Sequence, residues 1–257
     1  MNDRRRRKQY AFVIQQLTLR EMKRRYARSY LGILWSVLNP LMSMAVLSLI
    51  FSRMFQKSIE NFPIYYLTGY ILWQTFTGAT TTAITALTDN KLLLLKVKFP
   101  MEIFIVTRVY TAAVNLLYSL AAYMIMLIVF RVRMKGTMLL LPIIIFFLLL
   151  FSLGMSYILA TGYVFFGDLK HLYTVMLTLW MYCSGLFYPA EELEGMIRQV
   201  VLLNPVYVFI KSLRGAVMYG TVPDQHEFLQ MILWSTGMFL TGRLVFRKNR
   251  NRITASL

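Results

Sequence analysis

Residues 20–41 read REMKRRYARSYLGILWSVLNPL, so a dense basic segment runs directly into a long apolar one. Ten of the first 28 residues are Lys or Arg, whereas residues 31–55 carry a single charge, Arg53. Cationic residues that flank a membrane span are retained on the cytoplasmic side of the bilayer. The junction therefore predicts a first membrane-spanning helix, preceded by a basic segment on the cytoplasmic membrane surface.

The composition is that of an integral membrane protein. The chain has 257 residues, of which 58% are hydrophobic and 15% charged, and its mean hydropathy is +0.55. Soluble domains are only about 45–50% apolar. The net charge of +17 lies beside apolar runs, so we expect membrane lipids and no nucleic acid as partners. The single cysteine, Cys183, excludes an intramolecular disulfide and a multi-cysteine metal site.

The apolar stretches predict an all-α membrane protein with one transmembrane domain. About 20 apolar residues cross the hydrocarbon core as a helix. Six stretches predict transmembrane helices, at about 32–54, 64–87, 102–130, 138–166, 172–189 and 227–246. Six spans place both termini on one side of the membrane. That side holds 19 Lys and Arg residues against eight on the other, which predicts cytoplasmic N and C termini.

The basic segment before the first span has the pattern of an amphipathic interfacial helix. Thr18-Leu19-Arg20-Glu21 matches the capping box, in which a threonine and a glutamate satisfy the first free N–H groups of a helix. The apolar face of the helical pattern also changes at this point. We therefore predict that a separate helix begins near residue 19 within the cytoplasmic interfacial segment 1–30. Its cationic side would face phosphate or water.

Two short amphipathic patterns lie between the fifth and sixth predicted spans. The first has apolar residues at helical spacing from Leu193 to Val201 and stops at Asn204-Pro205. The second covers Val206 to Tyr219 and stops at Gly220. Two linked helices too short to span predict a re-entrant hairpin or a lid over 190–219. Helices resting on the outer leaflet fit the pattern equally well.

The sequence contains no motif of a nucleotide-binding or metal-dependent enzyme. It has no Gly-x-x-x-x-Gly-Lys loop, no Gly-x-Gly-x-x-Gly turn and no His-Glu-x-x-His. Arg108 is the main ionisable residue inside a predicted span, so a proton or ion relay through the bilayer lacks acidic groups. We therefore expect a chain that is no enzyme, binds no metal and takes its energy from elsewhere.

Uncharged polar residues and aromatic residues recur at helical spacing within the spans. Gln74, Thr77, Thr81, Thr85 and Thr88 lie within about 80° of one another on a helix. They either line a hydrophilic path or hydrogen-bond their own backbone and pack helices together. Tyr173, Trp180 and Phe187 recur every seven residues, which suits contact with sugar rings or helix packing.

The predicted cytoplasmic loop 88–100 contains an apolar run, residues 92–95, between lysines. Such a run is too short to span a membrane and too apolar to remain in water. It is covered either by a partner or by this chain itself.

Several segments in order resemble the membrane subunits of ABC-type exporters of lipid-linked polysaccharides, which include O-antigen, capsule and teichoic-acid export permeases. The matching segments are Arg20 to Tyr26 with Ser29, Leu31-Gly32, Trp35 and Pro40, then Phe99-Pro100, Gly167 to His171, Phe187-Tyr188-Pro189, Asn204-Pro205 with Tyr207, and Tyr219-Gly220. Glu21 stands where this family often has Asp.

The resemblance implies a homodimer around a translocation path in the bacterial cytoplasmic membrane. It implies two copies of a separate ATP-binding subunit, so ATP and Mg belong to that partner and this chain binds no cofactor. The segment 88–100 would be the coupling helix and 190–219 an external gate. The residues implied to contact the ATPase are Asp89, Lys91, Leu92, Leu93, Leu94, Leu95 and Lys96, with Asp168, Lys170 and His171 as a second contact.

The function implied is export of a polysaccharide or teichoic acid linked to polyprenyl pyrophosphate. The hypothesised contacts to the pyrophosphate are Arg20, Lys23, Arg24, Arg25 and Arg28, because charge-assisted hydrogen bonds are strong. The hypothesised path residues are Trp35, Phe51, Phe55, Trp73, Gln74, Thr77, Thr81, Thr85, Tyr173, Trp180 and Phe187.

Two alternative functions are export of small hydrophobic molecules and a membrane-embedded transferase acting on polyprenyl lipids. A hydrophobic cargo needs no long polar path. A transferase would show paired carboxylates or a metal-binding acidic cluster. The only acidic cluster is Glu191, Glu192 and Glu194, without a basic or histidine partner in sequence.

Overall fold

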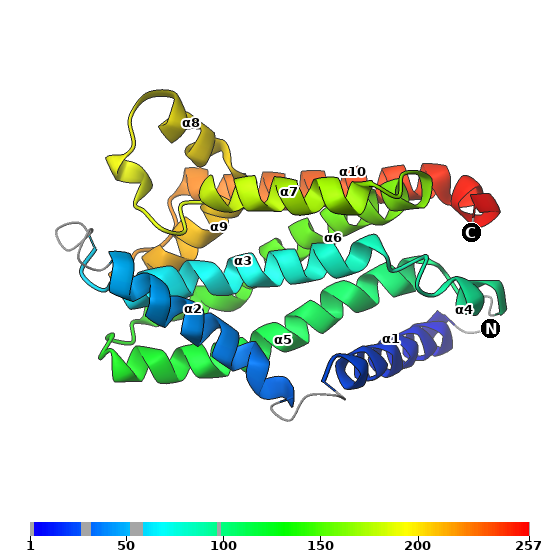
Figure 1. Cartoon of the computed structure of the whole chain (residues 1–257), viewed down its shortest axis with the longest axis horizontal. Coiled ribbons are helices and arrows are strands. Elements are labelled where there is room, and N and C mark those ends of the chain that lie inside the picture. Colours follow the sequence, from blue (N-terminus) through cyan, green and yellow to red (C-terminus); the bar gives the residue numbers. More distant parts are fainter. Residues whose placement is uncertain (1–2, 27–31, 52–58, 97–98, 257) are drawn as a thin grey trace.

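The computed structural model describes residues 3–26, 32–51, 59–96 and 99–256, and this part of the chain forms helices and turns without a β-strand. The all-α prediction is confirmed. Figure 1 shows an elongated bundle whose long helices follow its long axis. Both termini lie at the same end of the bundle as α4 (Lys91–Lys96), and α8 (Gly195–Leu203) lies at the opposite end.

The long helices pack side by side in the bundle. They are α3 (Phe62–Ile84), α5 (Glu102–Val129), α6 (Leu141–Phe165) and α10 (Gln225–Ser256). The most extensive contact joins α6 to α10, and α3 packs on both α5 and α6. The remaining helices are α1 (Asp3–Tyr26), α2 (Trp35–Phe51), α7 (Leu169–Tyr182) and α9 (Pro205–Arg214). Short 3₁₀ turns cover Gly32–Leu34, Gly136–Leu140 and Ala190–Glu192, and the π-helical turn η4 covers Gly215–Tyr219.

Asparagine and proline define two of the helix starts. The side chain of Asn61 accepts a hydrogen bond from the backbone N–H of Ile64 at 3.3 Å, and Asn204 accepts one from Val206 at 2.9 Å. A proline lies in the first turn of each helix. Asparagine satisfies an N–H group that has no partner inside the helix, and proline at the start removes another. Local sequence therefore starts α3 and α9.

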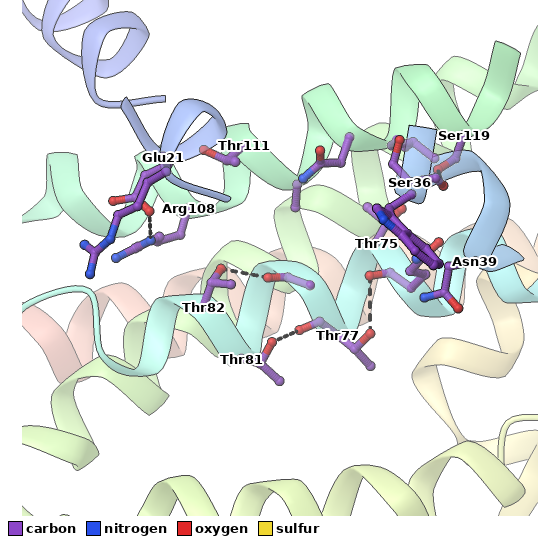
Figure 2. Close-up of a pocket in the computed structure, with 17 residues that line it drawn as sticks. Glu21, Ser36, Asn39, Thr75, Thr77, Thr81, Thr82, Arg108, Thr111 and Ser119 are labelled. Atoms are coloured by element: carbon purple, nitrogen blue, oxygen red, sulfur yellow. Dashed lines mark hydrogen bonds and ion pairs between the residues drawn. The ribbon is translucent and has the colours of Figure 1, made fainter. Parts of the chain in front are cut away.

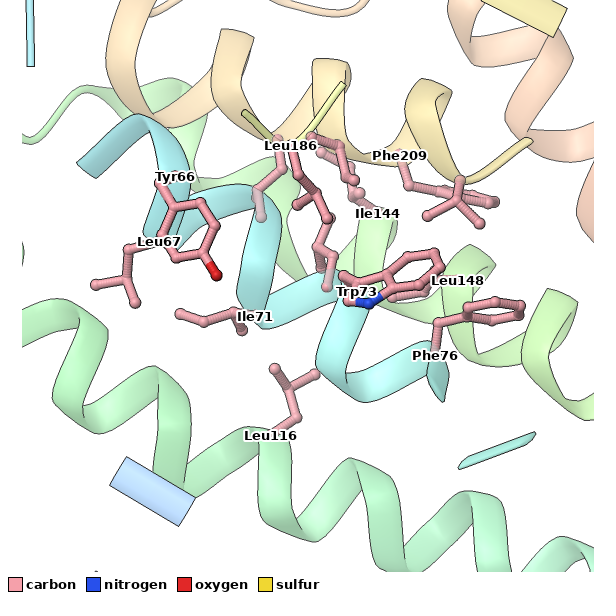
Figure 3. Close-up of a cluster of buried hydrophobic side chains, with 14 of the residues drawn as sticks. Tyr66, Leu67, Ile71, Trp73, Phe76, Leu116, Ile144, Leu148, Leu186 and Phe209 are labelled. Atoms are coloured by element: carbon pink, nitrogen blue, oxygen red, sulfur yellow. The ribbon is translucent and has the colours of Figure 1, made fainter. Parts of the chain in front are cut away.

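The main apolar core lies around α3. Its Leu67, Ile71 and Phe76 belong to one cluster of buried side chains with Leu148 of α6 and Phe209 of α9 (Figure 3). Lipid tails are as apolar as these residues, so release of water contributes little to helix association inside a bilayer. Close packing between helices therefore holds this part of the bundle together.

The α6 and α10 backbones meet at two glycines. A Cβ atom on Gly242 would overlap the backbone of Gly154, and a Cβ atom on Gly154 would overlap the backbone of Met238. Nearby, the Ser235 hydroxyl donates a hydrogen bond to the carbonyl of Phe147 at 2.8 Å. Small residues let helix backbones approach closely in membranes. The contact therefore depends on the absence of side chains at both positions.

Among the described residues, two helices are long and apolar enough to cross a membrane, Glu102–Val129 and Gly136–Phe165. The pair Gly195–Leu203 and Pro205–Tyr219, bent by 83°, would be a third if it formed one span, by length and composition. The six-span topology stays a prediction. At 14 residues, α7 is shorter than the predicted span 172–189, and the end of the predicted span 32–54 lies outside the described residues.

The predicted helix start near residue 19 is wrong. Helix α1 is continuous from Asp3 to Tyr26 and passes through Thr18. Thr18 is buried and its hydroxyl has no hydrogen-bond partner in the described part of the chain, while Glu21 binds Arg108 at 2.5 Å. A distant arginine therefore takes the carboxylate that the capping box would use.

The predicted boundary inside 190–219 is confirmed, because α8 ends at Leu203 and α9 begins at Pro205. The following turn ends at Gly220, whose φ of +68° favours glycine. Helix α9 is buried against α3, α6 and α10, whereas α8 exposes Met196 and Ile197. Of these two helices, α8 lies on the surface and α9 in the interior. A re-entrant path for the pair stays a prediction.

Candidate functional site

A polar cavity of about 680 Å³ lies among α1, α2, α3 and α5 (Figure 2). One end holds the charged pair Glu21 and Arg108, and the other holds Ser36, Asn39 and Ser119. The wall between them consists mainly of hydroxyl and amide side chains. These are Gln74, Thr75, Thr77, Thr81 and Thr82 of α3, with Thr111 and Asn115 of α5.

Five residues predicted to contact the substrate or its path lie on this wall. They are Arg24, Trp35, Gln74, Thr77 and Thr81. Thr77 donates its hydroxyl proton to the carbonyl of Trp73 at 2.9 Å, and Thr81 donates to that of Thr77 at 2.6 Å. The hydroxyl protons of these two threonines thus bond the helix itself, and the hydroxyl oxygens remain as acceptors on the cavity wall. A role of the stripe in a hydrophilic path stays a prediction.

The wall contributed by α5 was missed from the sequence. Thr111, Asn115 and Ser119 recur every four residues, which places them on one helix face. Thr111 donates to the carbonyl of Thr107 at 2.8 Å, and Ser119 donates to the carbonyl of Ser36 at 3.1 Å. The spacing was visible in the sequence, but only the fold places it opposite the α3 stripe.

The charged end of the cavity is an ion-pair network around Arg108, which is 8% exposed. Its guanidinium lies 2.5 Å from the Glu21 carboxylate and 3.0 Å from that of Asp89. Arg20 donates to the side-chain oxygen of Asn90 at 2.7 Å and lies 3.5 Å from Glu21. The network joins α1, α5 and the turn before α4.

A family model described as ABC-2 type transporter matches residues 13–218. The chain belongs to the ABC-2 type transporter family. The resemblance found in the sequence is confirmed, and the chain is an integral membrane protein.

Relatives of this ABC-2 transporter chain match it over nearly its whole length. It is 29% identical over 251 residues to the O-antigen export system permease protein RfbA of Myxococcus xanthus, covering 97% of this chain and 96% of the relative. A protein of the same name from Klebsiella pneumoniae is 28% identical over 244 residues, covering 94% and 93%. The polysialic acid transport protein KpsM of Escherichia coli is 21% identical over 252 residues, covering 95% of each chain.

Besides Arg24, four cations of this ABC-2 transporter chain were predicted to bind pyrophosphate. Of these, Lys23 is exposed and does not line the cavity. The side chain of Arg25 and all of Arg28 lie outside the described part of the structure. Arg24 is therefore the predicted cation that the structure places on the cavity wall.

The other predicted path residues that the structure describes do not line this cavity. Thr85 donates to the carboxylate of Asp89 at 2.9 Å, and Phe55 lies outside the described residues. The others take part in packing within the chain. Trp73 packs on Phe76, Tyr173 donates to the Thr80 hydroxyl at 2.8 Å, Trp180 donates to Asn204 at 2.8 Å, and the ring centroid of Phe187 lies 6.3 Å from that of Phe51. Their role in a path stays a prediction.

The predicted coupling segment forms the short helix α4. Leu92 is 74% exposed, whereas Leu93 and Leu94 are half-buried against a cluster that includes Leu17 and Leu87. The apolar run is thus covered in part by its own chain and in part left open. The side chain of Leu95 lies outside the described part. The exposed charged residues predicted at this contact are Asp89, Lys91, Lys96, Asp168, Lys170 and His171.

Arg214 is a second buried cation, which sequence analysis did not identify. It is 3% exposed, and its guanidinium donates to the carbonyls of Tyr65, Gly185 and Leu186 at 3.1, 2.7 and 3.0 Å. Its Cζ lies 3.4 Å from the centroid of the Tyr65 ring, a cation–π contact. An arginine in an amphipathic run gives no sign of burial, so only the fold reveals that it joins α9 to α3.

Proposed function

We propose that the chain is the permease subunit of an ATP-driven exporter that moves a polysaccharide attached to polyprenyl pyrophosphate. The family and the names of the relatives, which are O-antigen and polysialic acid transport proteins, support export of a polysaccharide. The observation that carries the proposal is the polar cavity, because its wall offers hydroxyl oxygens along α3 and α5 and a cation, Arg24, at one end.

The wall suits a sliding sugar chain. Each threonine oxygen can accept one weak hydrogen bond from a sugar hydroxyl, and none of these contacts is charge-assisted. A polymer that exchanges such contacts one at a time meets no deep energy minimum. A small hydrophobic cargo would displace water from the polar side chains of this wall without replacing the hydrogen bonds, so it fits the cavity less well.

The pyrophosphate fits the charged end. Arg24 lines it and is the cation that would contact the phosphates, while Arg108 is held by Glu21 and Asp89 and would contribute only its charge. Charge-assisted hydrogen bonds to phosphate oxygens are about twice as strong as neutral ones. A headgroup held here would leave the first sugars beside the threonine stripe.

The working assembly in this proposal is a homodimer of six-span subunits in the bacterial cytoplasmic membrane. Two ATP-binding subunits carry ATP and Mg and dock on α4, whose Leu92 is exposed. Figure 1 places both termini at the α4 end of the bundle, as cytoplasmic termini require. Teichoic acid linked to the same lipid is an alternative cargo.

Replacing Arg24 with glutamine tests the headgroup contact. We expect the concentration of polyprenyl-pyrophosphate oligosaccharide that half-maximally stimulates ATP hydrolysis by the complex to rise about tenfold, the loss of about 1.4 kcal/mol. The measurement is ATPase activity of the purified complex in proteoliposomes.

The matched control is Lys248→Gln, which removes an exposed cation of α10 outside the cavity and should leave the stimulation unchanged. Equal stimulation of wild type and Arg24→Gln would show that the headgroup does not bind there. If lipid-linked oligosaccharide stimulates no variant and not the wild type either, the proposed cargo is wrong.

A further inference from the structure

We infer that a second cavity, at the opposite end of the bundle from α4, binds an uncharged sugar unit of the emerging polymer. The cavity has a volume of about 440 Å³ and lies among the start of α3, α9, η4 and the segments before α8 and α10. This volume falls within the range of about 300–1,000 Å³ that small-molecule sites occupy. The inference rests on the proposed function, since that function supplies the sugar.

Three tyrosines contribute to the wall of this cavity. Tyr65 and Tyr207 are buried and Tyr219 is half-exposed, and all three line the cavity. The hydroxyls of Tyr207 and Tyr219 make no hydrogen bond to other residues in the part of the chain that the structure describes, whereas Tyr65 donates to the carbonyl of Tyr188 at 2.9 Å. Tyrosine combines an apolar face with a polar tip, as a sugar ring requires.

The charges of the wall exclude an anion. Lys211 is already paired with Glu227 at 2.8 Å, and the Arg214 guanidinium donates to three carbonyls. Glu191 and Glu192 also line the cavity. An entering anion would therefore meet two carboxylates, while the nearby cations are already engaged.

A metal ion or an apolar molecule fits the second cavity no better than an anion does. Within the described residues, no three His, Cys, Asp or Glu side chains are grouped so that they could hold a metal ion. An apolar ligand would desolvate the carboxylates and the ammonium group without replacing their hydrogen bonds with water. A neutral ligand rich in hydroxyl groups can donate to the glutamates and accept from the tyrosines.

Ser212 gives independent support. It lines the cavity and is 1% exposed, and its hydroxyl has no hydrogen-bond partner among the described residues. A buried hydroxyl without a partner costs free energy that a ligand hydroxyl would recover. The π-helical turn η4 follows directly at Gly215, and such turns are frequent at functional sites.

The test measures protection of a single cysteine by free polysaccharide. The complex carries Cys183→Ala and Thr221→Cys, because Thr221 is exposed on the cavity wall. The probe is polysaccharide from the producing cells, released from its lipid by mild acid. We expect saturating polysaccharide to slow maleimide labelling of Thr221→Cys at least about fivefold, with half-protection at a defined concentration.

Adding Tyr207→Phe removes one hydroxyl without changing the ring. It should raise the concentration for half-protection about threefold to tenfold. The matched control is Gln199→Cys on exposed α8, whose labelling the polysaccharide should not slow. Equal slowing at both positions, or no slowing of Thr221→Cys, would overturn the inference.

The outcomes separate this inference from the proposed function. Protection by free polysaccharide needs neither ATP nor pyrophosphate. If free polysaccharide protects Thr221→Cys but the lipid-linked substrate does not stimulate the ATPase, the sugar site in the second cavity is supported and the proposed cargo is rejected. If the lipid-linked substrate stimulates the ATPase but free polysaccharide does not protect Thr221→Cys, only the sugar site in the second cavity is rejected.

Discussion

Replacing Gly242 with alanine is expected to destabilise the protein by more than about 3 kcal/mol, the upper range for overpacking a tight contact. The added Cβ would overlap the Gly154 backbone of α6, and real Cβ atoms essentially never lie within 3.0 Å of such a neighbour. A flexible side chain could move aside, but a helix backbone cannot. The helices α6 and α10 would have to separate, and the Ser235 hydrogen bond to Phe147 would be lost with their packing.

The control lies in the same helix. A Cβ on Gly237 would meet nothing within 4 Å, so Gly237→Ala adds a better helix former at no steric cost and should stabilise by up to about 1 kcal/mol. Both variants are heated in detergent and the folded fraction is measured by size-exclusion chromatography. Equal melting temperatures for Gly242→Ala and Gly237→Ala would show that the backbones are not in contact.

The sequence predicted the helices whose ends have local causes. The predicted spans 102–130 and 138–166 agree closely with Glu102–Val129 and Leu141–Phe165, because long apolar runs between polar residues set them. Helix α7 ends at Tyr182, well before the predicted residue 189. The chain turns at Gly185, with φ of +59°, and Trp180 binds Asn204, contacts that hydropathy does not encode.

The sequence predicted one wall of the candidate site, the one that a local pattern defines. The α3 stripe repeats at helical spacing, so Thr77 and Thr81 could be predicted on one face. The opposite wall and the ion pairs join residues far apart in the chain, such as Glu21 and Arg108. No local pattern pairs these two residues, and the capping box prediction was wrong because the distant arginine binds Glu21.

Replacing Arg108 with glutamine is expected to destabilise the protein by about 3 kcal/mol, because a largely buried carboxylate then keeps only the more distant and exposed Arg20 as a charge partner. The Glu21 side chain is 14% exposed, so water cannot replace the arginine fully. The more exposed Asp89 contributes less, since solvent screens it. Thermal unfolding in detergent measures the loss.

The matched control is Arg247→Gln, whose guanidinium lies 3.9 Å from Glu102 with both side chains in contact with solvent. Its effect should stay within about 0.5 kcal/mol. A double-mutant cycle of Glu21→Gln and Arg108→Gln should give a coupling energy of at least about 1 kcal/mol. A coupling energy below about 0.5 kcal/mol, the scatter expected for independent sites, would mean that the two groups do not form a pair in solution.

The same network is placed to carry motion to the partner ATPase of the proposed exporter. Arg108 holds α1 through Glu21 and the turn before α4 through Asp89, and it also lines the cavity. These pairs therefore give binding at the cavity a direct connection to α4. Arg108→Gln should keep basal ATP hydrolysis in the reconstituted complex and lose most of its stimulation by lipid-linked oligosaccharide. Full stimulation in a complex that melts earlier would assign the network to stability alone.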